Sequence, residues 1–121
     1  MTYKEVGTLI AGIGLDYAYN HFTDDTEHEL PYICFYFSEA EDFVADDTNY
    51  QKIRLLDIEL YTENKDYDIE ETVENALNEA GLVYDKSETF LESELMYMVV
   101  FTTSVVITEE VPEPETTTEG E

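Results

Sequence analysis

The stretch IELYTENKDYDIEETVENAL, residues Ile58 to Leu77, changes from the alternation of a strand to the periodicity of a helix. Its first part belongs to a longer strand-like segment, residues 51–62, in which side chains point to opposite faces in turn. The alternation predicts one core face and one partly solvated face. The core face holds Leu56, Ile58 and Leu60, and the other face holds Leu55, Asp57, Glu59 and Tyr61.

The second part of this stretch predicts an amphipathic helix from Asp68 to Ala80 that ends at Gly81. Asp68 and Glu71 lie in its first turn, where a carboxylate caps free N–H groups and favours the positive end of the helix dipole. Glu74 and Glu79 are expected on the outer face. The buried stripe is formed by Ile69, Val73, Ala76, Leu77 and Ala80.

A first helix is predicted near the N-terminus, in the segment TYKEVGTLIAGIG. Thr2 and Glu5 have the spacing of a capping box, and Gly14 lies where a helix-ending glycine belongs. The apolar stripe of this helix consists of Val6, Leu9, Ile10 and Ile13.

The remaining segments predict strands. Residues 15–22 are strand-like, and residues 31–37 are apolar on both faces, which indicates an interior strand. Residues 38–50 form an acidic loop or a hairpin tip, and the segments LVYDKSETFLE and ELMYMVVFTTSVVI form a hairpin. The expected fold is α+β, with two helices packed on a mainly antiparallel sheet of about five strands. The order is helix, three strands, helix, two strands.

The chain divides into one domain, residues 1–107, and a C-terminal tail, residues 108–121. A chain of 121 residues is long enough to bury a single core. The tail contains six Glu, two Pro and no basic residue, a composition typical of disorder.

The formal net charge of −25 is the extreme property of this sequence. With five Lys and Arg against 30 Asp and Glu, the chain cannot bind nucleic acid through phosphate neutralisation. The same charge disfavours binding to an anionic membrane surface. No apolar run approaches the roughly 18 residues that a membrane helix needs, and the N-terminus lacks the order of a signal peptide. The single Cys34 lies in an apolar run and is expected to be buried as a small hydrophobic residue. One cysteine permits no disulfide within the chain, so a reducing compartment is expected.

No segment predicts catalysis, a cofactor or a dedicated metal site. Carboxylate pairs such as Asp24–Asp25 and Asp46–Asp47 are expected by chance at this acidic density and lie in the most polar loops, whereas a general acid needs a carboxyl whose pKa is raised by burial. The acidic loops lack the ordered spacing and the turning glycine of an EF-hand, so divalent binding would be incidental. His21 and His28 have no clustered partner of the kind that zinc requires. The chain is therefore not expected to be an enzyme.

Two classes of function remain open. An assembly protein would use apolar strand faces and aromatic segments as interfaces. A DNA mimic, or another acidic inhibitor, would present ordered carboxylates in place of phosphates to a nucleic-acid-handling protein such as a nuclease or a repressor. Many of the carboxylates lie in loops and in the tail rather than on one rigid surface, which favours the assembly protein.

The overall pattern resembles a family of phage proteins. The run from FVADDTNYQKIRLLDIELYT to MYMVVFTTSVVI, with its aspartate-rich loop, IELYT strand, helix ending in AG and final hairpin, is similar to tail terminator, or tail-completion, proteins of long-tailed phages and prophages of Gram-positive bacteria. The opening YKEVGTLIAGIGLDYAYNHF and the segment PYICFYF extend the resemblance over nearly all of residues 1–107.

The resemblance implies a structural virion protein, without cofactor, in the tail or neck and assembled in the host cytoplasm. Such proteins form a homo-oligomeric ring, usually a hexamer, at the head-proximal end of the tail. The ring ends tube growth and contacts the tail tube protein and the head-tail connector protein. DNA passes through it without being bound, and a carboxylate-lined wall would repel phosphates. The candidate channel or subunit-contact residues, which solvent-facing loops would equally explain, are Asp24, Asp25, Glu27, Asp42, Asp46 and Asp47.

Overall fold

The computed structural model describes residues 1–22, 29–45 and 49–108. Within these residues the chain forms two helices and a sheet, which confirms the predicted α+β class. The elements are α1 (Tyr3–Ala11), β1 (Asp16–Tyr19), β2 (Tyr32–Ala40), β3 (Phe43–Ala45), β4 (Asn49–Thr62), α2 (Tyr67–Glu79), β5 (Tyr84–Leu91) and β6 (Met96–Ile107).

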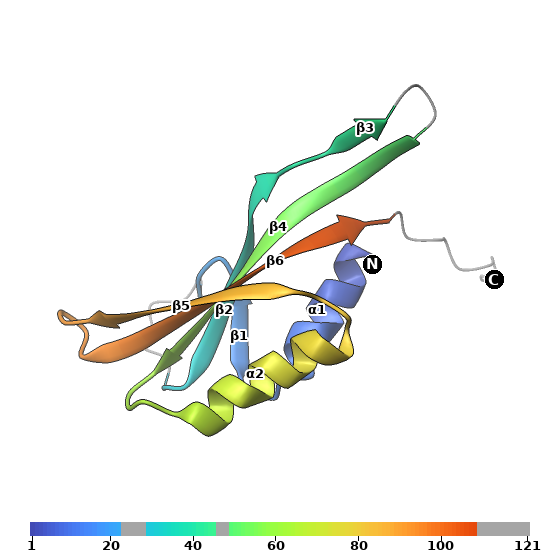
Figure 1. Cartoon of the computed structure of the whole chain (residues 1–121). Coiled ribbons are helices and arrows are strands. Elements are labelled where there is room, and N and C mark those ends of the chain that lie inside the picture. The colour runs from blue at the N-terminus through green and yellow to red at the C-terminus, as the bar shows by residue number, and fades with distance from the viewer. Residues whose placement is uncertain (23–28, 46–48, 109–121) are drawn as a thin grey trace, which may run out of the picture.

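Five of the strands form a continuous sheet in the order β1-β2-β4-β6-β5 (Figure 1). Neighbouring strands are antiparallel except for β1, which lies parallel to β2. The short β3 pairs with the start of β4 outside this order. It falls in the segment predicted to be a loop or a hairpin tip, and its pairing makes that segment a hairpin.

The 14-residue β4 is the scaffold of the sheet, because it pairs with β2, β3 and β6. The predicted alternation along β4 is confirmed, since Leu56, Ile58 and Leu60 are completely buried on one face. Burying an aliphatic side chain of this size contributes about 1.5–3 kcal/mol to folding. Both helices pack on this face (Figure 1). The core that joins them to the sheet comprises Val6, Ile10, Ile13, Ile33, Phe35, Leu56, Ile58, Leu60, Val73, Leu77, Val99, Phe101, Val105 and Ile107.

Helix α1 begins at the predicted capping box. The Thr2 hydroxyl accepts a hydrogen bond from the Glu5 N–H at 3.0 Å, and the Thr2 N–H donates to the Glu5 carboxylate at 2.9 Å. Val6 and Ile10 then face the sheet and are buried. Gly14 follows the helix with a φ of 96°, a conformation that glycine adopts without strain.

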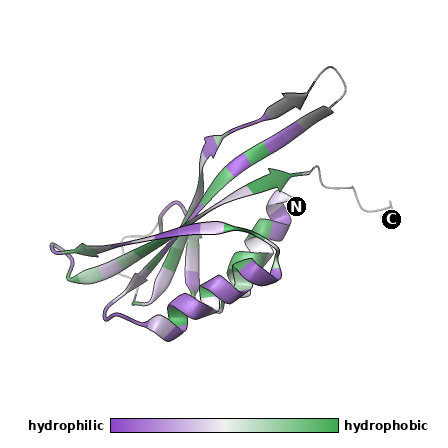
Figure 2. Ribbon diagram, in the orientation of Figure 1, coloured by the Kyte–Doolittle hydropathy of each residue, from purple (hydrophilic) through white to green (hydrophobic). Residues whose placement is uncertain are grey.

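Helix α2 begins one residue earlier than predicted, at Tyr67, and its cap is Asp66 rather than a residue of its first turn. The Asp66 carboxylate accepts a hydrogen bond from the Ile69 N–H at 3.1 Å. Val73 and Leu77 are completely buried, as the stripe predicted. The outer side of the helix is hydrophilic (Figure 2).

The two hairpins extend the sheet in different directions (Figure 1). A register shift between Phe37 and Glu39 interrupts the pairing of β2 with β4, just before the β3–β4 hairpin. At the end of β6, the Met1 ammonium donates to the Val106 carbonyl at 3.1 Å, and the Thr108 N–H donates to the Met1 carbonyl at 2.9 Å. The N-terminus therefore lies against the last strand.

In the described part of the chain, neither helix is long and apolar enough to cross a membrane. Residues 109–121 lie outside the described residues. The predicted disordered tail, and the domain boundary after residue 107, therefore stay predictions.

Candidate assembly surfaces

Of the six candidate channel or contact residues, the structure describes Asp42 alone. The other five lie outside the described residues, and their role stays a prediction: Asp24, Asp25, Glu27, Asp46 and Asp47.

Asp42 lies between β2 and β3, and its carboxylate is engaged within its own chain. It accepts a hydrogen bond from the Ile53 N–H at 3.1 Å and forms an ion pair with Arg54. Next to it, the Glu41 N–H donates to the Ile53 carbonyl at 2.8 Å. Asp42 thus holds the base of the β3–β4 hairpin against β4, a role that the sequence did not indicate.

A buried carboxylate joins α2 to the strand that follows it. Glu70 points towards the sheet with a side chain that is 1% exposed. Lys65 Nζ lies 2.6 Å from one of its oxygens, and Lys86 Nζ on β5 lies 2.9 Å from the other. Burial alone would raise the pKa of Glu70, but the two ammonium groups outweigh it and hold that pKa below its usual value.

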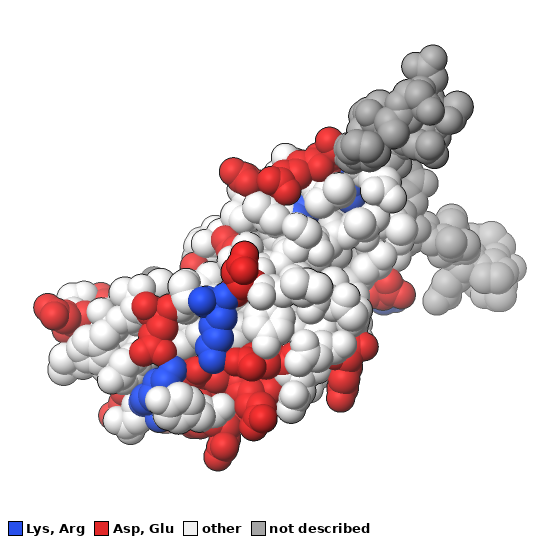
Figure 3. Space-filling view, in the orientation of Figure 1, with Lys and Arg blue, Asp and Glu red and all other residues white. Residues whose placement is uncertain are grey.

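Two further carboxylates complete this network. Glu74 accepts a hydrogen bond from Lys86 at 2.7 Å, and Glu88 forms an ion pair with Lys65. The prediction that Glu74 lies on the solvated outer face is therefore wrong, because its side chain turns towards β5. The exposed position of Glu79 is confirmed. Figure 3 shows carboxylates gathered over α2 with basic side chains beside them.

The face of the sheet opposite the helices carries hydrogen-bonded carboxylates. Glu59 on β4 accepts from the hydroxyls of Tyr36 at 3.0 Å and Tyr61 at 2.7 Å, and Asp57 accepts from Thr102 at 2.6 Å. Burial and the hydrogen bond to Glu59 raise the pKa of Tyr36 to about 12. The face combines half-buried aromatic rings with ordered negative charge, as an assembly surface or a DNA mimic would.

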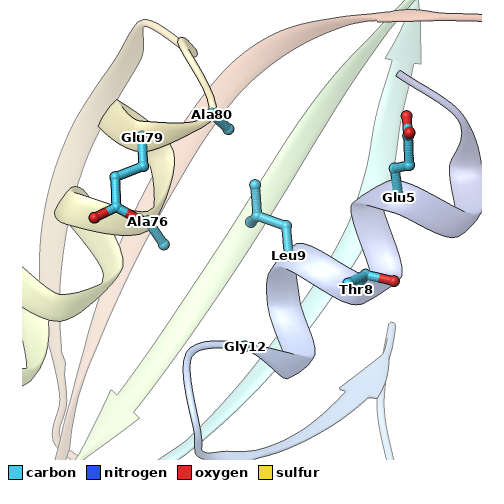
Figure 4. Close-up of a pocket in the computed structure, with 7 residues that line it drawn as sticks. All are labelled: Glu5, Thr8, Leu9, Gly12, Ala76, Glu79 and Ala80. Atoms are coloured by element: carbon cyan, nitrogen blue, oxygen red, sulfur yellow. The ribbon is translucent and has the colours of Figure 1, made fainter.

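A groove runs between the two helices. In Figure 4, Leu9 projects from α1 towards α2, and Ala76 and Ala80 face it from the other side. Glu5 and Glu79 also line it, but Glu5 is already engaged in the helix cap. Apolar surface predominates in the groove, and of its polar side chains Glu5 caps α1 and Thr8 donates to the Lys4 carbonyl, so few polar groups remain to orient a small ligand.

An aromatic hollow opens between α1 and the edge of the sheet at β1. The Tyr3 and Phe37 rings pack edge to face with centroids 5.2 Å apart, and Tyr19 packs on Phe35 at 5.3 Å. These four aromatic residues and Gly7 enclose an open space of about 450 Å³. No local pattern in the sequence indicates this hollow, although the one-turn spacing of Tyr3 and Gly7 puts both residues on one side of α1.

Among the described residues, no group of three or more His, Cys, Asp or Glu side chains is placed to hold a metal ion. Cys34 is free and buried on β2, as its apolar surroundings predicted. Burial, with a smaller contribution from Glu59, raises the pKa of its thiol, so its thiolate is disfavoured. His21 Nδ1 lies 3.0 Å from the Phe22 carbonyl.

The comparisons with known proteins give information about the fold alone. No family model matches the chain, and no curated protein matches it. Among solved structures, the chain is similar to a protein in the virion of a native gene transfer agent particle. The TM-score is 0.52 at 16% identity, and the match covers 86% of this chain and 88% of the other chain. The likeness therefore extends over nearly the whole of both folds.

Proposed function

We propose that this protein is a structural virion protein that forms a ring at the head-proximal end of a phage tail. The ring ends growth of the tail tube and joins the tail to the head connector while DNA passes through. The observation that carries this proposal is the near full-length fold likeness to a chain of a gene transfer agent virion. The sequence resemblance to tail terminator proteins supports the more specific role.

We also propose that the protein acts without catalysing a reaction. Several of the described carboxylates are used in helix caps, ion pairs and hydrogen bonds to tyrosine hydroxyls, as Glu5, Glu70 and Glu59 illustrate. Such contacts hold the folded chain in one conformation. A rigid subunit whose function is to contact its neighbours needs this arrangement, and it needs neither a cofactor nor a reactive side chain.

The charge suits a channel through which DNA moves. A surface with a net charge of −25 repels phosphates and gains nothing from release of their counterions. The same charge keeps free subunits soluble before assembly. Ring closure then requires contacts that are apolar or charge-paired, because unpaired carboxylates on facing subunits repel one another.

Native mass spectrometry of the purified protein, alone and with tail tubes, tests this proposal against the DNA-mimic alternative. A closed homo-oligomer, formed alone or on the tube end, supports the ring. A monomer that does not bind tail tubes but inhibits a nuclease stoichiometrically would refute the ring proposal and establish that the protein is a DNA mimic.

A further inference from the structure

The aromatic hollow leaves space that the described side chains do not fill. Gly7 lies inside α1, where glycine weakens a helix relative to alanine. A Cβ added at Gly7 would have nothing within 4 Å, so close packing of a described neighbour does not require glycine here. The other residues that line the hollow are the four aromatic residues named above. An apolar occupant over Gly7 would therefore contact aromatic rings on several sides.

The C-terminal segment of this chain, residues 109–121, begins within reach of the hollow. The Thr108 N–H donates to the Met1 carbonyl at 2.9 Å, so the segment starts beside the N-terminus of α1. The two residues from Met1 to Tyr3 span at most about 7 Å, and α1 rises about 6 Å from Tyr3 to Gly7. The six residues from Thr108 to Pro114 span up to about 20 Å when extended. The segment is thus long enough to cover the hollow.

The composition of this segment suits an aromatic hollow. Apart from one glycine, its apolar residues are Val111, Pro112 and Pro114, which lie together near its start. Proline-rich segments dock on aromatic-lined grooves, and the fixed φ of proline limits the entropy lost on docking. A segment this rich in Glu and Thr buries too little apolar surface to fold alone, and it becomes ordered where it contacts another surface.

Charge separates the aromatic hollow from other cavities that the segment could occupy. The groove between the two helices is lined by Glu5 and Glu79, and a cavity at the start of β5 is lined by Asp85. Both would repel a Glu-rich segment. The lining of the aromatic hollow is uncharged, so it offers apolar contacts without this repulsion.

A lysine lies where the segment begins. Lys52 pairs with Ile107 between β4 and β6, so both side chains lie on the helix side of the sheet. Arg54, two residues along β4, is already engaged in an ion pair. None of the described ion pairs includes Lys52. Its ammonium is therefore placed to attract the two Glu residues that follow Thr108.

From these observations we infer that residues 109–115 fold back over α1 and dock in the aromatic hollow of their own chain, with Val111, Pro112 and Pro114 against its rings. A connection of a few residues gives an effective concentration of about millimolar, which favours docking within one chain over docking on a second copy. The inference goes beyond the proposed function and does not depend on it, because it concerns the free protein and needs neither a ring nor a tail tube.

The first test fills the hollow in the full-length protein. NMR relaxation gives the order parameter of the Glu113 amide, which lies between the two prolines. In the unchanged protein this order parameter exceeds about 0.6, and Gly7→Leu, which occupies the open space, lowers it below that value. The matched control Thr8→Leu adds the same side chain on the α2 side of the same helix and leaves the order parameter unchanged. Equal order parameters in the unchanged protein and Gly7→Leu would overturn the inference.

The second test changes the segment and leaves residues 1–108 intact, so it holds even if Gly7→Leu fails to fold. Replacing Val111, Pro112 and Pro114 by Ser removes the apolar contacts and keeps every charge, and the Glu113 amide becomes as flexible as in Gly7→Leu. Replacing the three Thr residues 116–118 by Ser is the control and changes nothing. Combining Gly7→Leu with the first set has no further effect, because both changes remove one contact. A Glu113 amide that stays ordered without the three apolar residues would contradict docking.

The third test reports the contact directly. A chain with Gly7→Cys, Pro114→Cys and Cys34→Ala is oxidised mildly at low concentration, and a disulfide within one chain forms, because docking brings the two Cα atoms within about 7 Å. The control places the first cysteine at Thr8, on the side of α1 that faces α2, and forms the bridge more slowly. Equal rates in the two chains would overturn the inference. A disulfide-linked dimer in place of the internal bridge would also overturn it, since the segment would then lie on a neighbouring copy.

Discussion

Lys65 on the loop before α2 and Glu70 inside that helix form an ion pair of 2.6 Å, although the Glu70 side chain is only 1% exposed. Lys86 reaches the same carboxylate from β5. Two of the five basic residues in the chain are therefore used to neutralise one buried acid. In a protein of net charge −25, this network fastens α2 to the edge of the sheet.

Glu70→Gln is expected to lower the free energy of unfolding by about 1–3 kcal/mol, because it leaves two ammonium groups short of their shared partner. Both lysines are partly exposed and keep Glu74 or Glu88, which limits the loss. Urea unfolding followed by circular dichroism measures the change. The control Glu79→Gln alters an exposed carboxylate on the same helix and leaves stability unchanged or slightly improved. Equal stability of the two variants would mean that the network is dispensable.

The difference in stability between the unchanged protein and Glu70→Gln is expected to depend on pH, and the direction follows from the pKa of Glu70. The pKa of Glu70 is lowered in the folded protein, so its contribution to stability is present above the unfolded pKa of about 4.3 and is lost as pH falls through the folded value. The stability gap between the unchanged protein and Glu70→Gln is therefore constant near neutral pH and shrinks below about pH 4.3. Repulsion among the carboxylates outside this network changes alike in both proteins and cancels in the difference. A gap that widens as pH falls would contradict the assigned pKa direction.

The central part of the fold could be predicted because local patterns and tertiary contacts agree. The alternation of Leu56, Ile58 and Leu60 and the helical spacing of Val73 and Leu77 each report burial directly. The capping box and the left-handed glycines are also local signals. They locate the ends of elements without knowledge of the partner strand.

The buried carboxylate of α2 and the aromatic hollow could not be predicted, because they depend on contacts between residues that are distant in the sequence. Glu70 flanks the apolar stripe of α2, and its burial follows from Lys86, which only the pairing of β5 with β6 brings beneath the helix. The aromatic hollow needs the parallel pairing of β1 with β2, which no local pattern encodes. The left-handed conformation of Leu95 could not be expected from the sequence, since glycine or asparagine ordinarily occupies such a position.

Leu77→Ala is expected to destabilise the fold by about 2–5 kcal/mol, because Leu77 is completely buried between α2 and the sheet. The variant removes packing and leaves every described ion pair intact. Urea unfolding measures it against Asn78→Ala, an exposed neighbour on the same helix. A loss below 1 kcal/mol would show that α2 is less firmly packed than the structure indicates.

Salt is expected to favour assembly. Raising ionic strength from a low value to about 0.3 M shortens screening to about 6 Å and weakens repulsion between acidic subunits. The oligomer fraction measured by light scattering therefore rises with sodium chloride. Dissociation by salt would indicate that ion pairs, rather than apolar contacts, close the ring.

The length of tails made without this protein tests the central claim most directly. In particles produced after deletion of its gene, the account predicts tails of uncontrolled length that lack heads, and restoration of uniform, head-joined tails when the gene is supplied in trans. Electron micrographs give the length distribution. Tails of normal, uniform length joined to filled heads in the deletion strain would contradict a role in ending and joining the tail.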